Sequence, residues 1–203
     1  MGLMRDLFGP SRGEIWRQLA EEIGADYVDG GFWKGDKVQA SEGQWTITLD
    51  TFTESSGKHS QTYTRMRAPY VNADGFQFSI HREGFFSGVG RFFGMQDLEM
   101  GDPQFDEDFV LQGNNEAKVR ELLQDDEVRR LLQAQPRVHI HVRDSEGWFG
   151  ATFPDGVDEL YFRAAGVIRD VEQLKALYAL FSAVLNRLCA MGSAYDSRPG
   201  VEL

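Results

Sequence analysis

The chain has little of several features that mark common classes of protein. It contains a single cysteine, Cys189, in 203 residues, so no internal disulfide can form and a reducing compartment is expected. Basic runs are also missing, and 32 acidic residues against 21 basic ones give a net charge of −11. A surface of that sign repels phosphate backbones, so nucleic acid is not expected as a partner.

Long hydrophobic runs are missing too. The most apolar stretch, ALYALFSAVLN between Lys175 and Arg187, has about half of the roughly 20 residues that a transmembrane helix needs. The first residues lack the long apolar segment of a signal peptide. We therefore expect a cytoplasmic protein without a transmembrane segment.

What the chain does contain is typical of a globular protein with many strands. Hydrophobic residues make up 41% of it, and 22 glycines with six prolines indicate many tight turns. From Lys37 to His81 the apolar positions alternate, as in WTITLDTF, and the segments ESSGK and NADG separate the alternating runs as turns. The alternation returns in RVHIHVRD, WFGATF and DELYFRAAG. These patterns predict antiparallel hairpins.

Helical patterns lie at both ends of the chain and in its middle. Ser11 with Glu14 forms a capping box, which predicts a helix to about Gly24. Two short helices are expected over 114–123 and 126–135, and Asp170 caps a long last helix that runs to about Met191. The order predicts an α+β fold on an antiparallel sheet, while the pattern leaves open whether the strands form one sheet or two. The expected organisation is a short amphipathic N-terminal segment (1–10), a single α+β domain (11–192) and a polar C-terminal tail (193–203).

The last helix is apolar nearly all round. Its core stripe consists of Leu174, Leu177, Tyr178, Phe181, Leu185 and Leu188, and its opposite side carries Ala176, Ala179, Leu180, Ala183 and Ala190. A helix of this kind is covered on both sides. The second cover is expected from the helix at 11–24, which favours a monomer, with a homodimer through the same side as the alternative.

The stretch GMQDLEMGDPQFDEDF, from Gly94 to Phe109, holds six acidic residues. Calcium loops place carboxylates at alternate positions around a glycine, and this spacing is irregular. Phe105 and Phe109 are four residues apart, so one helical turn can bury both while the acids between them face water. We therefore predict core residues at Phe105 and Phe109 and no metal site in the stretch.

A glycine-rich segment, SGVGRFFG, invites comparison with nucleotide-binding loops. Its glycines read G-x-G-x-x-x-G and lack the strand, helix and parallel context of a dinucleotide site. Two interpretations remain: the phenylalanines close one end of the core, or the loop docks a partner or an anionic ligand. The residues of this predicted interaction loop are Arg82, Phe85, Phe86, Arg91, Phe92 and Phe93.

His139 and His141 lie two apart in RVHIHVRD, so they share one face of a strand with Arg137 and Arg143. Two arginines make that face unfavourable for a divalent cation, and we predict a solvent-facing polar side. The nucleophile pattern G-x-S-x-G is missing, and Cys189 lies in an apolar helix. No catalytic, cofactor-binding or metal-binding residue is predicted, and no cofactor.

Three stretches, GMQDLEMGDPQFDEDFVLQGNNE, VRRLLQAQPRVHIHV and RDVEQLKALYALFSAVLNRLCAMGSA, resemble a family of bacterial proteins of unknown function. Members of that family share a G-x-Q-D turn, an F-D-x-x-F strand entry and a long closing helix. The resemblance covers the chain from about Trp45 onward. It implies no activity and transfers no catalytic residue to this chain.

The leading hypothesis is a soluble, non-catalytic binding or interaction module whose partner is a protein or another cell component. One alternative is a hydrolase that uses carboxylates near Asp97–Asp108. A second alternative is peripheral membrane association through the N-terminal segment MGLMRDLFG.

Overall fold

The strands form one sheet, in a computed structural model that describes residues 10–31, 35–57, 59–84, 96–144, 153–201 and 203. All strand pairs in it are antiparallel, in the order β1-β2-β3-β4-β9-β8-β5-β7-β6, with β10 pairing β4. The strands are β1 (Asp26–Val28), β2 (Lys37–Glu42), β3 (Trp45–Ser56), β4 (His59–Asn72), β5 (Phe78–Arg82), β6 (Gln96–Leu98), β7 (Phe109–Gly113), β8 (His139–Arg143), β9 (Val157–Ala165) and β10 (Ala194–Tyr195). The choice between one sheet and two is thereby decided.

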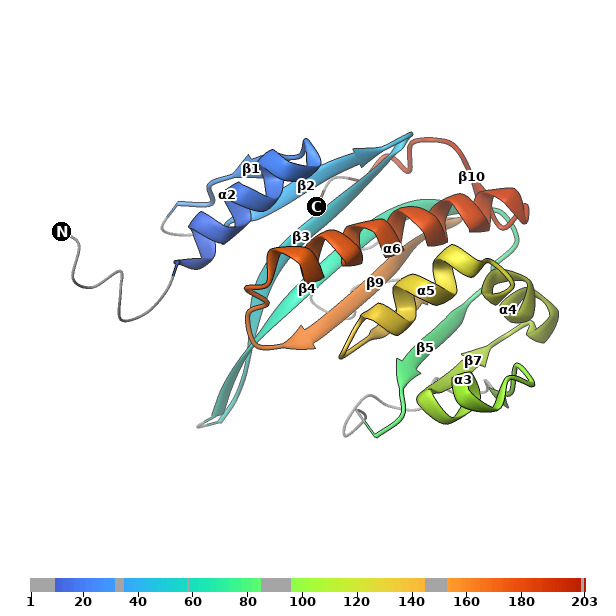
Figure 1. Cartoon of the computed structure of the whole chain (residues 1–203). Coiled ribbons are helices and arrows are strands. Elements are labelled where there is room, and N and C mark those ends of the chain that lie inside the picture. The colour runs from blue at the N-terminus through green and yellow to red at the C-terminus, as the bar shows by residue number, and fades with distance from the viewer. Residues whose placement is uncertain (1–9, 32–34, 58, 85–95, 145–152, 202) are drawn as a thin grey trace.

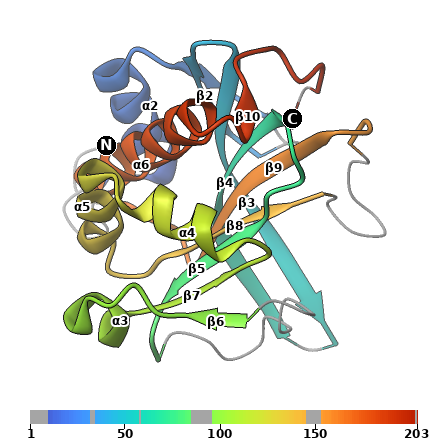
Figure 2. The same cartoon turned by 90° about the vertical axis from the view of Figure 1, so that its right-hand side faces the viewer.

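The helices gather on one face of this sheet (Figures 1 and 2). They are α2 (Arg12–Ile23), α3 (Pro103–Asp108), α4 (Glu116–Leu123), α5 (Asp126–Ala134) and α6 (Val171–Ala190). The predicted α+β fold is confirmed. None of the described helices is both long and apolar enough to cross a membrane.

Local sequence signals set the helix ends. The Ser11 hydroxyl accepts a hydrogen bond from the Glu14 amide, and the Glu14 carboxylate accepts one from the Ser11 amide at 2.9 Å, which completes the predicted capping box. Gly24 then ends α2 in the left-handed region, at φ 67°. Asp170 caps α6 by accepting from the Gln173 amide at 3.0 Å.

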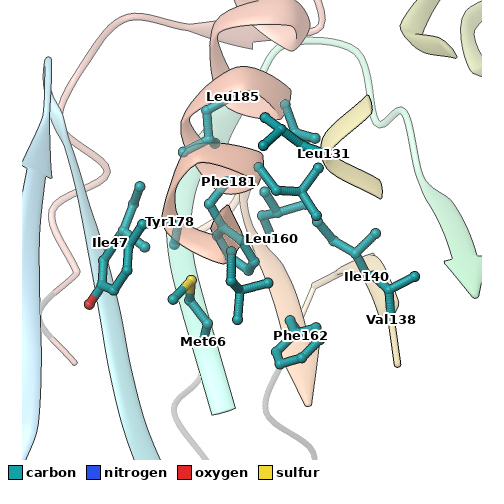
Figure 3. Close-up of a cluster of buried hydrophobic side chains, with 14 of the residues drawn as sticks. Ile47, Met66, Leu131, Val138, Ile140, Leu160, Phe162, Tyr178, Phe181 and Leu185 are labelled. Carbon is teal, nitrogen blue, oxygen red and sulfur yellow. The ribbon is translucent and has the colours of Figure 1, made fainter. Parts of the chain in front are cut away.

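The core lies between α6 and the sheet (Figure 3). Every second side chain of the central strands points toward α6, because side chains alternate across a strand. Tyr178, Phe181 and Leu185 of α6 meet Met66 of β4 and Leu160 of β9 in one buried cluster. The rings and branched side chains that fill this layer are what fix the position of α6.

The apolar outer side of α6 is covered only in part. The helix α2 lies along one side of α6, with the Lys175 ammonium 3.0 Å from the Glu22 carboxylate, and α5 lies along the other side (Figure 1). Leu180 is fully buried, whereas Ala179 is exposed. The prediction that the N-terminal helix packs on α6 is confirmed, but complete burial of the alanine side is wrong at Ala179 and Ala190, which are exposed.

Three short strands were not predicted from the pattern. β1 and β6 form the two edges of the sheet, and β10 pairs with the end of β4 through Ala194 opposite Asn72. The polar tail expected over 193–203 therefore begins inside the fold, with Ala194 buried. Strands of two or three residues carry too few positions for an alternating pattern to show.

The acidic stretch contains one short helix, α3, that turns two phenylalanines into the core, as predicted. Phe105 and Phe109 are 0% and 2% exposed, and their ring centroids are 4.6 Å apart. The guanidinium of Arg129 lies over the Phe105 ring and that of Arg82 over the Phe109 ring.

We expect Phe109→Ala to lower the free energy of unfolding by about 3–5 kcal/mol, because it empties a buried aromatic site. Chemical denaturation followed by circular dichroism measures the change. Glu107 is exposed in α3, two residues before Phe109, so Glu107→Gln should change stability by less than about 0.5 kcal/mol. Equal effects of the two substitutions would contradict a core role for Phe109.

Candidate functional site

The carboxylates of the acidic stretch are engaged in holding the connection from β6 to β7. Asp97 accepts a hydrogen bond from the Gln112 amide group at 2.8 Å. Asp102 caps α3 and pairs with Arg129. Asp106 accepts from the backbone amides of Met100 and Gly101, at 2.7 and 2.9 Å. Each of these three carboxylates therefore has a structural partner, which leaves little support for a hydrolase site built from them.

Of the predicted interaction loop, Arg82 is described, and Phe85, Phe86, Arg91, Phe92 and Phe93 lie outside the described residues. Arg82 donates to the carbonyls of Gln135 and Gln133, at 2.8 and 2.7 Å, and lies 3.7 Å from the Asp108 carboxylate. Its guanidinium thus ties the end of α5 to β5. The loop itself stays a prediction.

The histidine pair contradicts one expectation. His139 and His141 share a strand face as predicted, but each is only 7% exposed, so this face is not the solvent-facing side that the sequence suggested. Arg137 precedes β8 and is exposed. Alternation along one strand shows which residues share a face, but it does not show whether other parts of the chain bury that face.

These histidines belong to a band of polar side chains, which we call the polar stripe, on the sheet face away from the helices. Its members are Asp50, Arg65, Arg67, Ser79, His81, His139, His141, Arg143, Glu159 and Tyr161. At one end, Arg65 donates to both carboxylate oxygens of Asp50, at 2.7 and 2.8 Å, and Arg67 donates to the same carboxylate at 2.6 Å. Bidentate pairing of this kind fixes β3 and β4 in register.

At the other end of the polar stripe, aromatic and imidazole rings are in contact. Arg143 donates to the Glu159 carboxylate at 2.6 Å, and its guanidinium lies 3.6 Å from the centroid of the Tyr161 ring. The Tyr161 ring adjoins the His141 ring, and the His141 ring stacks on the His139 ring with centroids 4.4 Å apart. Charged and polar groups here are buried with partners, as burial of charge requires.

One pair in the polar stripe has the atoms of a nucleophile and its base. The Ser79 hydroxyl lies 3.2 Å from Nε2 of His139. Burial lowers the pKa of His139 to about 3, whereas an effective general base has a pKa near the operating pH. Ser79 is also 1% exposed, within a strand. The pair is therefore a buried structural hydrogen bond rather than a hydrolytic centre.

Three imidazoles of the stripe lie near one another, since the His81 and His139 ring centroids are 5.8 Å apart. Within the described part of the chain, no group of three or more histidine, cysteine or acidic residues has the geometry to hold a metal ion. The guanidinium of Arg143 nearby also opposes a dication.

We expect no tight binding of calcium, magnesium, manganese or zinc. Calorimetry on chelator-treated protein should show only weak surface binding. Submicromolar affinity that is lost on His141→Ala or Asp106→Asn would contradict this prediction.

A concave site lies on the opposite side of the molecule, across the outer surface of α6. This groove has a volume of about 540 Å³. Its floor is a stripe of small α6 side chains, Ala176, Ala179 and Ser182. On one side the groove is lined by Ile23 of α2, Ala40 of β2 and Ile47 of β3, and on the other side by Arg130 and Leu131 of α5. The helices α2 and α5 lie on these two sides of α6 (Figure 1). Its surface therefore combines an apolar floor with walls from four other elements.

Charges of both signs stand at the rim of the groove, in Glu42, Arg130, Glu172 and Lys175. Lys175 donates to Glu172 and to Glu22, both at 3.0 Å, and these hydrogen bonds raise the pKa of the ammonium. The rim thus has no net formal charge in a chain whose total is −11.

The wall beside β2 is held in place by a buried hydrogen bond. The Tyr178 hydroxyl donates to the Val38 carbonyl at 2.9 Å, and burial raises the pKa of this phenol. The contact joins α6 directly to β2. Contacts within the chain therefore fix the position of this wall of the groove.

Sequence reasoning identified the small side chains of α6 but missed the groove. Its lining comes from α2, β2, β3, α5 and α6, which are far apart in the chain. The one signal in the sequence was the alanine side of the last helix, which was interpreted as a buried contact.

Comparison with protein-family models gives no match, and no curated protein matches the chain in sequence. Among solved structures, the crystal structure of the mycobacterial trehalose monomycolate transport factor A, TtfA, is similar, with a TM-score of 0.50 and 10% sequence identity. The match covers 94% of this chain and 98% of that chain. At such low identity the similarity concerns the fold alone.

Proposed function

We propose that the chain is a non-catalytic binding module that holds an amphipathic helix of a protein partner in the groove across α6. The observation that carries this proposal is the groove itself, with an apolar floor, a volume of about 540 Å³ and charged residues at its rim. A concave, largely apolar site with a few polar groups is the usual form of a binding site.

The shape of the groove favours a helix as its occupant. The floor residues Ala176, Ala179 and Ser182 are small, so the backbone of another helix can approach α6 closely. The groove lining includes Ile23 of α2 and Arg130 of α5, and these two helices lie on either side of α6 (Figure 1). A helix laid between them would pack its apolar face on α6, as amphipathic helices do in other helix-binding grooves.

The charges at the rim favour a partner of mixed charge rather than a basic or acidic one. Glu42 and Glu172 can meet basic side chains on the edges of the partner helix, and Arg130 and Lys175 can meet acidic ones. Exposed pairs of this kind contribute specificity more than affinity.

The similarity in fold to TtfA is compatible with this proposal. The name of that protein describes a transport factor, and a factor that acts by binding needs no catalytic constellation. We also propose that the chain belongs to a bacterial family, that it is cytoplasmic and that it is a monomer. Membrane association through 1–9 concerns residues outside the described ones.

A photoreactive amino acid at position 179 tests the proposal, with position 190 as the matched control. Ala179 and Ala190 are both exposed alanines of α6, and only Ala179 lines the groove. We expect a discrete cross-linked protein from position 179 and none from position 190. Mass spectrometry of the product should place the cross-link in an amphipathic helical segment.

A synthetic peptide of that segment completes the test. It should bind the unsubstituted protein, lose at least roughly tenfold in affinity (about 1.4 kcal/mol) on Ala179→Arg and bind Ala190→Arg unchanged. Equal binding to both variants would contradict the proposal. A cross-link between two copies of this chain, with a dimer in sedimentation, would assign the groove to self-association instead.

A further inference from the structure

The junction between β5 and β8 is a narrow point in the sheet. It joins β5, β7 and β6 to the rest of the sheet through three residue pairs, Ser79–His141, Ile80–Ile140 and His81–His139. The neighbouring junctions, of β8 with β9 and of β5 with β7, have four and five such pairs, and that of β4 with β9 has eight. Because strand pairing is cooperative along a junction, the shortest internal junction is where separation of the sheet costs least.

Histidines occupy most of the polar side of this junction. His81 stands directly opposite His139, with ring centroids 5.8 Å apart, and His141 stacks on His139 at 4.4 Å. The three side chains are 8%, 7% and 7% exposed. The other side of the junction carries Ile80 opposite Ile140, both fully buried.

We propose that the β5–β8 junction is a proton-sensitive seam, at which the sheet opens when the histidines on its polar side become charged. Two imidazolium groups in directly opposed positions would repel each other across the three-pair junction. Water screens that repulsion poorly at such low exposure.

Taken together, the charged groups around the histidines oppose protonation in the closed sheet more than they favour it. Among the described residues, the charged and titratable groups that face the cluster from neighbouring elements include Glu83, Asp97, Arg143, Glu159, Tyr161 and Arg163. Glu159 is already paired with Arg143. The positive charges of Arg143 and Arg163 oppose protonation of His141, while Glu83 and Asp97 favour it only at His81.

The pH range in which the junction opens depends on how many protons the closed and open forms bind. Burial is the main cause that lowers the pKa of all three histidines, to about 3 for His139, against an ordinary value of about 6.5 in an open chain. The open form therefore binds more protons between these values, so closure is fully stable above about pH 6.5 and weakens as the pH falls toward about 3. Each pH unit in that range favours opening by up to about tenfold through His139, and the lowered pKa values of His81 and His141 act in the same direction.

Hydrogen exchange of the full chain between pH 7 and pH 4, corrected for the intrinsic pH dependence, tests the seam. We expect amides of β5 and β8 to lose at least about tenfold in protection on acidification before those of the β3–β4 hairpin do. The neutral double variant His81→Gln/His139→Gln should keep that protection to lower pH. His59→Gln, at an exposed position of the β3–β4 hairpin, should behave as the parent.

Two outcomes would overturn the proposal. One is loss of protection in β5, β8 and the β3–β4 hairpin at the same pH, which would indicate global unfolding. The other is loss in the double variant at the pH of the parent. If the double variant fails to fold, nuclear magnetic resonance of the parent decides: an imidazole of His139 that titrates near its ordinary pKa in the closed sheet contradicts the seam.

Discussion

The structure depends on the burial of α6 against one face of the antiparallel sheet. Eight side chains of α6 are buried, among them Tyr178, Phe181 and Leu185, which meet Met66 of β4 and Leu160 of β9. Removing such apolar surface from water is the largest favourable contribution to folding. Because α6 occupies the middle of that face, α2 and α5 pack along its sides, and α4 follows beyond α5. The small residues on the outer side of α6 then leave a groove rather than another layer of core.

The packing of α6 on one face of the sheet also places the groove and the polar stripe on opposite sides of the molecule. A sheet with helices on one face turns its alternate side chains to the other, and here many of those are charged, hydroxyl and imidazole groups. Arg65 and Arg67 share the Asp50 carboxylate, and Arg143 pairs with Glu159, so the polar stripe stabilises strand register through paired charge. The groove, by contrast, has an apolar floor and a rim without net formal charge. The proposed binding through the groove and the proposed proton-linked opening of the polar side therefore concern opposite faces of the sheet.

The carboxylates of Asp97, Asp102 and Asp106 illustrate why an acid-rich stretch is weak support for catalysis. Each accepts a hydrogen bond from an amide, in two cases from the backbone of a turn or helix end. Such bonds stabilise α3 and the turn before it, which in turn place Phe105 and Phe109 in the core. Acidic residues at helix starts are favoured by the free backbone amides there, with no ligand required.

The sequence by itself determined the elements whose signals are local. The capping box at Ser11 and Glu14, the turn at Asn72–Gly75, the alternation of β3 and β4 and the cap at Asp170 all depend on neighbours a few residues away. The burial of Phe105 and Phe109 followed from their spacing for the same reason. Only the tertiary structure decided that the strands form one sheet, that β10 returns to β4, and that His139 and His141 are buried. It also placed Ala179 in a groove, between elements that are more than a hundred residues apart in the chain. These outcomes depend on which segments meet in space, and a local pattern carries no information about that.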